Sequence, residues 1–372
     1  MSQPPSLQEQ VLARWEIAAE EVASSLTQKL VVAFLGSASS GKDSAIRAIF
    51  EVDFGQVDPI PGSTERVRVA AIDPGEQVLV VNAPGFGDVR AEVDAAAREV
   101  MNQVDVAVYV LNCDGGATID ERRDLDTIRA LGRPTLVCLN KIDLIRPHQQ
   151  EAFIEATLEQ LALDRSDAVI TAFDPIPALF DEPIGVQEVR RWIHSKLDKQ
   201  GKGLLFAKTL RNRAAACDVV IAAAAKRAAV AGALPIPGAD ATAVTAIQVK
   251  LISDIAAIHN HRIDRDLVLF IIGEALAGGS KGFVRWAVNA AKTAGFIPGG
   301  QVVHIATSAL GASISAGTTW GVGRAAVAFI QSGGKLNGKA LREIFDREAF
   351  SYGALSDSSH AHSGDAGEDS NS

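Results

Sequence analysis

Short apolar runs alternate with segments of helical periodicity over about the first 200 residues. The apolar runs that suit buried strands lie at 30–35, 78–81, 106–111, 134–139 and 168–171. The segments whose apolar positions recur every three or four residues lie at 43–50, 91–104, 118–131, 149–163 and 186–197. A Pro-Gly turn at 73–75 joins the run at 78–81 to an alternating one at 67–71, which predicts a hairpin. This order predicts an α/β domain with a doubly wound, mostly parallel sheet and a ligand site at the carboxyl ends of its strands.

Helical patterns flank this segment on both sides. Ser6 and Glu9 form a capping-box pattern, and apolar residues then recur at helical spacing as far as Leu26. After residue 203 the strand patterns stop, and helices are predicted at 204–234, 240–258, 267–277, 283–294, 301–330 and 337–350. The predicted domains are an N-terminal amphipathic helix (1–29), the α/β domain (30–200), an all-α helical bundle (201–353) and a disordered acidic tail (354–372).

A glycine-bounded loop after the first strand carries the clearest chemical pattern in the chain. Its sequence, GSASSGKDS, lies between a strand and a helix, which is the setting of a phosphate-binding P-loop. The backbone amides of such a loop and the helix N-terminus favour an anion, and Lys42 would reach the terminal phosphates of a nucleotide. The residues expected to bind phosphate are Gly36, Ser37, Ala38, Ser39, Ser40, Gly41, Lys42, Asp43 and Ser44.

Two later segments indicate which base the nucleotide carries. NKID at 140–143 follows the strand at 134–139, and the carboxylate of Asp143 can accept hydrogen bonds from both N1–H and the exocyclic amine of guanine. Adenine cannot donate this pair, so the pattern favours guanine. The residues expected at the base are Asn140, Lys141, Asp143, Thr171, Ala172 and Phe173.

Taken in order, these motifs resemble the G domain of the Era-like GTPases, bacterial members of the translation-factor-related (TRAFAC) class. The resemblance covers about residues 30–198 and includes PGSTE at 61–65 and NAPG at 82–85. It implies a Ras-like P-loop fold that binds GTP and GDP with Mg²⁺ and hydrolyses GTP to GDP and phosphate. It also implies catalytic roles for Lys42, Thr64 and Gly85, with Thr64 a ligand of Mg²⁺.

Two positions depart from that family pattern in opposite directions. Asp43 stands where the family has Ser or Thr, and Asn82 stands where it has an Asp that supports the metal. The resemblance implies that these two positions face each other across the metal. In one interpretation the negative charge has therefore changed sides, so that Asp43 binds Mg²⁺ and Asn82 supports its water shell. In the other, metal binding is damaged and the domain binds nucleotide weakly or without turnover. Phe86 replaces the water-orienting Gln of Ras-like proteins, so we expect slow intrinsic hydrolysis. In the relatives that share this feature, a dimer partner or another group often completes the catalytic site.

The helical half resembles a bacterial domain of unknown function that often follows Era-like G domains and also occurs in inner-membrane proteins. The segment GALPIPGAD at 232–240 and the alanine-rich helix after it carry this resemblance. The order of helix, G domain and bundle is also similar to that of immunity-related, dynamin-like GTPases. Residues 293–323 lack charge, but a Pro-Gly-Gly break and many small polar residues favour a soluble bundle over a membrane span. The basic residues proposed to contact a membrane surface are Lys208, Arg211 and Arg213.

Charge and cysteine content bear on partners and compartment. Residues 1–200 carry 19 Lys and Arg against 32 Asp and Glu, whereas residues 201–353 carry 17 against 9. The acidic first half argues against DNA as a partner. The basic second half fits an anionic surface (membrane or RNA) or an ordinary solvated helical face equally well. The three cysteines lack metal or disulfide spacing and the N-terminus lacks a secretion signal, so we expect a cytoplasmic protein, with peripheral binding to the inner membrane as an option.

Three functions are therefore in view. The first is a slowly hydrolysing regulatory GTPase that couples its nucleotide state to the helical bundle, with a G-domain homodimer and an anionic membrane surface as candidate partners. The second is a guanine-nucleotide-binding scaffold that does not hydrolyse. The third is a ribosome-associated GTPase, which is weakened because the helical half contains no RNA-binding module such as a KH loop.

Overall fold

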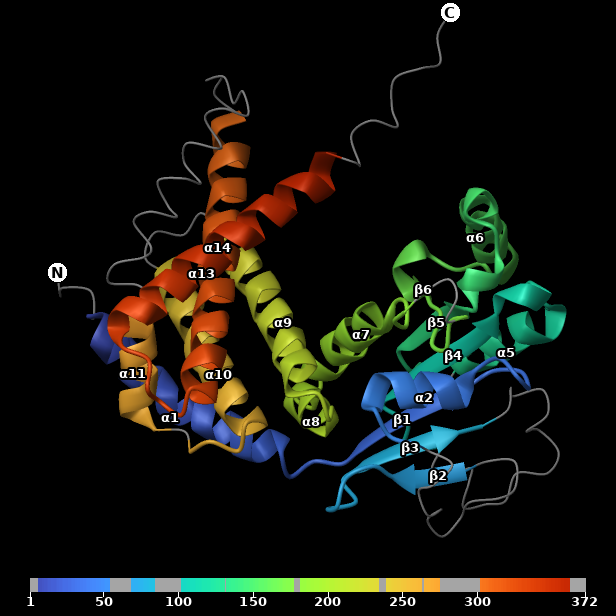
Figure 1. Cartoon of the computed structure of the whole chain (residues 1–372), viewed down its shortest axis with the longest axis horizontal. Helices are drawn as coiled ribbons and strands as arrows, with labels where there is room; N and C mark the ends of the chain where they lie inside the picture. The colour runs from blue at the N-terminus through green and yellow to red at the C-terminus, as the bar shows by residue number, and fades with distance from the viewer. Residues whose placement is uncertain are drawn as a thin grey trace, which may run out of the picture. The chain divides into compact units, whose positions relative to one another are not determined.

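The computed structural model describes most of the chain as two compact units. The described residues are 6–53, 68–83, 102–130, 132–176, 181–233, 239–262, 264–274 and 302–361. One unit consists of Ser24–Val219, and the other combines Met1–Ala23 with Val220–Ser372 (Figure 1). Each unit is described by itself below.

The unit Ser24–Val219 is built on a six-stranded sheet with the order β2-β3-β1-β4-β5-β6. Its strands are β1 Leu30–Leu35, β2 Arg68–Ala71, β3 Val78–Asn82, β4 Val106–Asn112, β5 Thr135–Asn140 and β6 Ala168–Ile170. All neighbours pair in parallel except β2, an antiparallel edge strand on β3. Every residue of β1 is buried, as expected for a parallel strand with helices on both faces. The predicted doubly wound α/β fold is confirmed.

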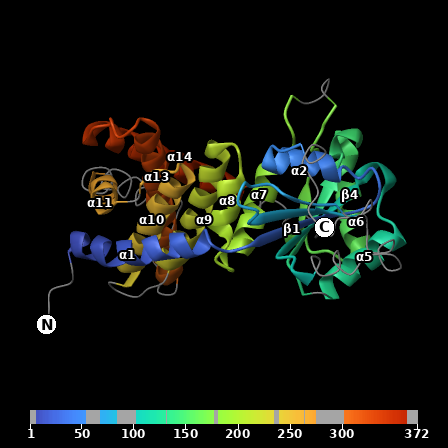
Figure 2. The same ribbon diagram turned by 90° about the horizontal axis from the view of Figure 1, so that it is seen from below.

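Helices cover the two faces of this sheet, and side chains alternate between them with the period of a strand. They are α2 Lys42–Phe50, α5 Ile119–Ala130, α6 Pro147–Leu161, α7 Val186–Asp198 and α8 Gly203–Thr209. α2 and α5 lie on opposite faces (Figure 2). Val31, Ala33 and Leu35 of β1 share a core with α5 and α6. Phe34 instead meets Phe50 at the end of α2, with ring centroids 6.2 Å apart.

The second unit is helical. It holds most of α1 Leu7–Ser25 and α9 Arg213–Ala233, together with α10 Ala239–Ile258, α11 Arg265–Glu274, α13 Val302–Gln331 and α14 Gly338–Ala361. The predicted capping box opens α1, since the Ser6 backbone N–H and hydroxyl both donate to Glu9 at 2.7 and 2.8 Å. α9 and α13 cross closely, because a Cβ on Gly232 would collide with Ser315 and with the carbonyl oxygen of Gly311. The small residues Gly311 and Ser315 therefore allow tight helix packing.

Three helix and domain bounds differ from the sequence-based expectation. The predicted helix at 204–234 is split into α8 and α9, because the Asn212 side chain caps the second helix by accepting from Ala214 N and Ala215 N at 3.0 and 3.1 Å. The α/β unit continues past the predicted boundary at residue 200, since Phe206 of α8 is fully buried and packs on Phe50.

The last helix also differs from its prediction. α14 runs to Ala361, into the range 354–372 that was expected to be disordered; a helix adds residues readily once its first turns exist. The helix predicted at 91–104 falls almost wholly, and the one at 283–294 entirely, outside the described residues. Within the described part of the chain, no helix is both long and apolar enough to cross a membrane.

Two segments of the α/β unit that lie far apart in sequence meet beside the amino end of β1. The Ser25 hydroxyl at the end of α1 donates to the carbonyl oxygen of Gly201 at 2.7 Å. The carboxylate of Asp105 accepts both from the Val31 backbone N–H at 3.0 Å and from the Lys202 ammonium at 2.6 Å. Asp105 and Lys202 are largely buried, so the segment before α8 is fixed to the first strand through a charge-assisted contact.

A buried arginine holds the C-terminal end of α2. Arg190 of α7 donates to the carbonyl oxygens of Ile49 and Ala48, each at 2.9 Å, and to the Glu51 carboxylate at 3.2 Å. These carbonyls belong to the last turn of a helix and have no partner within it. Burial lowers the pKa of Arg190, while Glu51 favours its charged form. Arg190 therefore supplies the donors for carbonyl oxygens in the last turn of α2.

Removing that guanidinium should destabilise the α/β unit. Arg190→Ala leaves the last carbonyls of α2 without donors, and the free energy of unfolding should fall by about 3 kcal/mol. Arg191→Ala is the matched control, because the Arg191 side chain is 50 % exposed and its ion pair with Glu188 is long, at 3.7 Å. This substitution should lower the free energy of unfolding by less than about 0.5 kcal/mol. Urea denaturation, with hydrogen exchange of β1 amides to identify the unit, measures both. Equal costs for the two variants would contradict the assignment.

Candidate nucleotide-binding site

The P-loop joins β1 to α2 at the carboxyl end of the sheet, where sequence analysis placed the site. Gly36, Ser39 and Gly41 all have positive φ, at 141°, 60° and 99°. A Cβ on Gly36 would collide with the carbonyl oxygen of Val110, and one on Gly41 with the side chain of Asn140. Glycine is therefore required at both ends of the loop, which lies directly against β4 and β5.

Lys42, the first residue of α2, folds back over this loop. Its ammonium donates to the carbonyl oxygens of Gly36 at 2.9 Å and Ser37 at 2.8 Å. Partial burial lowers the pKa of Lys42, and the neighbouring Asp43 carboxylate opposes that shift. The ammonium thus lies at the N-terminus of α2, where the helix dipole favours an anion. A loop with glycines at both ends, backbone amides and this cation fits a phosphate group.

Asn140 connects the P-loop to the predicted base-binding residues. Its side-chain nitrogen donates to the carbonyl oxygen of Ser40 at 2.8 Å, and its side-chain oxygen accepts from the Phe173 backbone N–H at 3.1 Å and from the Thr171 hydroxyl at 3.5 Å. Asn140 is 2 % exposed, so these bonds are shielded from water. The structure therefore brings together segments that lie about 30 and about 100 residues away from Asn140 in sequence.

The remaining residues predicted at the base surround this bond network. Lys141 has φ of 66°, which turns the chain after β5, and Asp143 follows in a short 3₁₀ helix, half-buried. One carboxylate oxygen of Asp143 accepts from the Ile176 backbone N–H at 3.1 Å. Ala172 pairs with Ile184 through two backbone hydrogen bonds, which holds the 171–173 segment in place. The carboxylate of Asp143 and the 171–173 segment therefore lie at the same edge of the sheet.

Asp43 and Asn82 are in direct contact. The side-chain nitrogen of Asn82, at the end of β3, donates to a carboxylate oxygen of Asp43 at 2.7 Å. The two positions that depart from the family pattern thus face each other, as expected. Their remaining oxygens are a carboxylate oxygen and an amide oxygen, which suit Mg²⁺ when water completes the coordination. Within the described residues, no group of three or more His, Cys, Asp or Glu could hold a metal ion.

Sequence analysis missed a buried carboxylate behind the P-loop. Glu121 of α5 is 6 % exposed and accepts from the hydroxyl of Ser37 at 3.3 Å. It also accepts from the backbone N–H and hydroxyl of Thr118 at 2.9 and 3.0 Å, which makes a capping box at the start of α5. The Thr-x-x-Glu spacing at 118–121 is the signal that would have identified it. Glu121 therefore links the start of α5 to Ser37 of the P-loop.

Two predicted catalytic residues, Thr64 and Gly85, lie outside the described residues, as does Phe86. Their roles remain predictions. The other predicted site residues are described, and most of them come from the carboxyl ends of β1, β3, β5 and β6.

Comparison with known proteins agrees with this geometry. Residues 31–141 match the model of a family described as 50S ribosome-binding GTPase. The chain is 25 % identical over 218 residues to GTPase Der of Protochlamydia amoebophila, a match that covers 53 % of this chain and 44 % of that protein. It is 26 % identical over 148 residues to a probable GTP-binding protein EngB of Gemmatimonas aurantiaca, covering 37 % and 72 %.

A third relative, GTPase Era of Caldanaerobacter subterraneus, is 24 % identical over 129 residues, covering 33 % of this chain and 43 % of the relative. The chain thus spans less than half the length of the Der and Era relatives it matches. The family match covers the P-loop, Asn82 and the start of the NKID motif. The α/β unit of this chain is an Era-like GTPase domain of the TRAFAC class.

Proposed function

We propose that this chain binds GTP and GDP in its α/β unit and acts as a slowly hydrolysing regulatory GTPase. The observation that carries the proposal is the bridge that Asn140 makes between the P-loop and the 171–173 segment. It places the phosphate-binding loop and the acceptor Asp143 at one edge of the sheet, which suits a nucleotide with a guanine base.

The proposed roles follow from the chemistry of each group. Lys42 and the P-loop amides hold the phosphates, while Asn140 and Asp143 select guanine. Asp43 holds Mg²⁺ with Thr64, and Asn82 supports its water shell. When bound, Mg²⁺ would neutralise charge on the phosphates. Slow turnover follows from Phe86, which cannot orient water by a hydrogen bond, and a second G domain in a homodimer is the candidate for completing the site.

We propose that GTP binding changes the helical unit and that this unit acts at an anionic membrane surface. GTP would order the segment around Thr64 and the segment after Gly85, as γ-phosphate contacts order switch loops. The excess of Lys and Arg in residues 201–353 supports an anionic partner for the helices. The protein would then act in the cytoplasm and bind the inner membrane peripherally.

Two alternatives each have an observation in their favour. The Asp43–Asn82 contact favours a guanine-nucleotide-binding scaffold without hydrolysis if it leaves too few metal ligands. The family description, 50S ribosome-binding GTPase, favours a ribosome-associated function. The experiments below separate these alternatives from the proposal.

Steady-state release of phosphate from GTP with Mg²⁺ tests the enzyme. We expect slow turnover of GTP and none of ATP, and Lys42→Ala should lower the rate by about 100-fold because it removes a charge that binds the phosphates. Lys29→Ala, an exposed lysine before β1, is the control and should keep the wild-type rate. Tight guanine-specific binding with no turnover would exclude the enzyme and favour the scaffold.

The exchange of charge between Asp43 and Asn82 calls for a double-mutant cycle. Asp43→Ser should raise the Mg²⁺ concentration that halves the GDP release rate by about tenfold, because it removes the carboxylate proposed to bind the ion. Asn82→Asp in that background should restore it, since the carboxylate returns to the opposite side. The measured quantity is the Mg²⁺ concentration that halves the GDP release rate. An unchanged value in Asp43→Ser would show that Asp43 is not a ligand.

Co-sedimentation separates the two proposed locations. The full chain with a non-hydrolysable GTP analogue should sediment with anionic vesicles and leave ribosomal subunits unbound, because its basic excess lies in the helical half. Binding to 50S subunits that depends on GTP, without binding to vesicles, would instead support the ribosome-associated alternative.

A further inference from the structure

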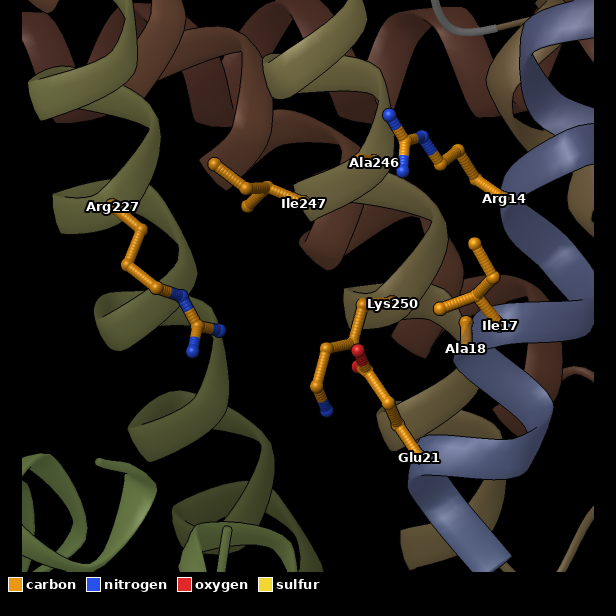
Figure 3. A pocket seen from close by; sticks show the side chains of 8 residues that line it. All are labelled: Arg14, Ile17, Ala18, Glu21, Arg227, Ala246, Ile247 and Lys250. Atoms are coloured by element: carbon orange, nitrogen blue, oxygen red, sulfur yellow. The ribbon is translucent and has the colours of Figure 1, made fainter. Parts of the chain in front are cut away.

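A pocket of the helical unit, with a volume of about 330 Å³, lies among α1, α9 and α10 (Figure 3). Its basic side chains do not converge on one point. The Lys250 ammonium contacts both carboxylate oxygens of Asp254 at 2.9 Å, and Arg227 has an interaction partner of its own. Arg14 points away from both, on the other side of α10 (Figure 3). The described charges of this pocket therefore give no indication of a ligand.

The base-binding edge of the α/β unit carries a more informative contact, because a backbone amide holds the carboxylate proposed to select guanine. One carboxylate oxygen of Asp143 accepts from the Ile176 N–H at 3.1 Å, between residues that lie 33 positions apart. In the described part of the chain, this is the one hydrogen bond that the carboxylate makes. An ionised carboxylate accepts at about four lone-pair sites, so most of its acceptor capacity stays available to a ligand.

The donor of this bond lies in a stiff segment of the chain. Ile176 stands between Pro175 and Pro177 in the sequence. Proline fixes its own φ near about −65°, and a residue that precedes a proline favours extended or polyproline II backbone. The Ile176 side chain is 43 % exposed, so packing contributes little to its position. The backbone itself therefore sets the direction of the N–H.

Two residues just before this segment fix it to the rest of the site. The Phe173 N–H donates to the Asn140 side-chain oxygen at 3.1 Å, and both residues are buried. The Asp174 carboxylate accepts from the Arg47 guanidinium of α2 at 3.0 Å. This second contact is exposed and adds little energy, but it joins the loop after β6 to the helix that follows the P-loop.

We infer that the Ile176 amide orients the Asp143 carboxylate for guanine, so that residue 176 is a positioning residue for base selection, an inference that rests on the proposed binding of GTP and GDP. The amide occupies one lone pair and stops rotation of the carboxylate. The remaining lone pairs then accept from N1–H and the 2-amino group of the base together. A carboxylate without this restraint would lose rotational freedom on binding, which costs affinity for the base that uses both contacts.

Ile176→Pro tests the role of the amide, because it removes the N–H and proline suits a position between two prolines. Calorimetry compares GDP with inosine diphosphate, whose base keeps N1–H and lacks the 2-amino group. The wild type should bind GDP at least about 30-fold more tightly than inosine diphosphate. In Ile176→Pro, GDP should bind about tenfold more weakly and this ratio should fall by about threefold or more. Equal weakening of the two nucleotides would overturn the inference, since a purely structural defect affects both alike.

The matched control is Ile176→Ala, which removes the exposed side chain and keeps the N–H. Its ratio of GDP to inosine diphosphate affinity should stay within about twofold of the wild-type ratio, and an equal fall in both variants would overturn the role of the amide. Asp143→Ala should bring the ratio close to one, which sets the lower limit. Wild-type protein that binds no guanine nucleotide would overturn the proposed function itself. Guanine-selective wild type with an unchanged ratio in Ile176→Pro would overturn the positioning role alone.

Discussion

A buried amide, that of Asn140, fixes the distance between the two halves of the nucleotide site. It uses its donor on the P-loop carbonyl of Ser40 and its acceptor on the backbone of Phe173. Because Gly41 packs against this same side chain, no larger residue fits at the start of α2 without displacing Asn140. The phosphate loop, the end of β5 and the loop after β6 therefore depend on one another. The restraint also extends behind the loop, where Glu121 contacts Ser37.

Arg190 adds a second restraint at the other end of α2. The P-loop holds the N-terminus of this helix, and the guanidinium holds its final carbonyls. A helix of nine residues has few hydrogen bonds of its own, so its position depends on these two ends and on the contact between Phe50 and the sheet. The phosphate site is thus preorganised by contacts that lie about two turns away from it.

The α/β fold and the nucleotide motifs were predictable from sequence because strands, helices and the P-loop each leave a local periodic or glycine pattern. The facing positions of Asp43 and Asn82 were also expected, from the family resemblance. The break at Asn212 was not predicted, since alanine-rich sequence on both sides hides a single capping residue. Arg190 and the contact between Glu121 and Ser37 were missed for a different reason, because the partners in these contacts lie far away in sequence. The pocket of the helical unit depends on how three helices pack, which no local pattern records.

The order of the two units along the chain has a consequence for how the protein is put together. The helical unit is made of two segments, Met1–Ala23 and Val220–Ser372, and the α/β unit lies between them in sequence. The chain is thus organised as a helical host that carries a GTPase domain as an insertion. Removal of that domain would leave α1 and the later helices as two separate segments, which only a new connection could join.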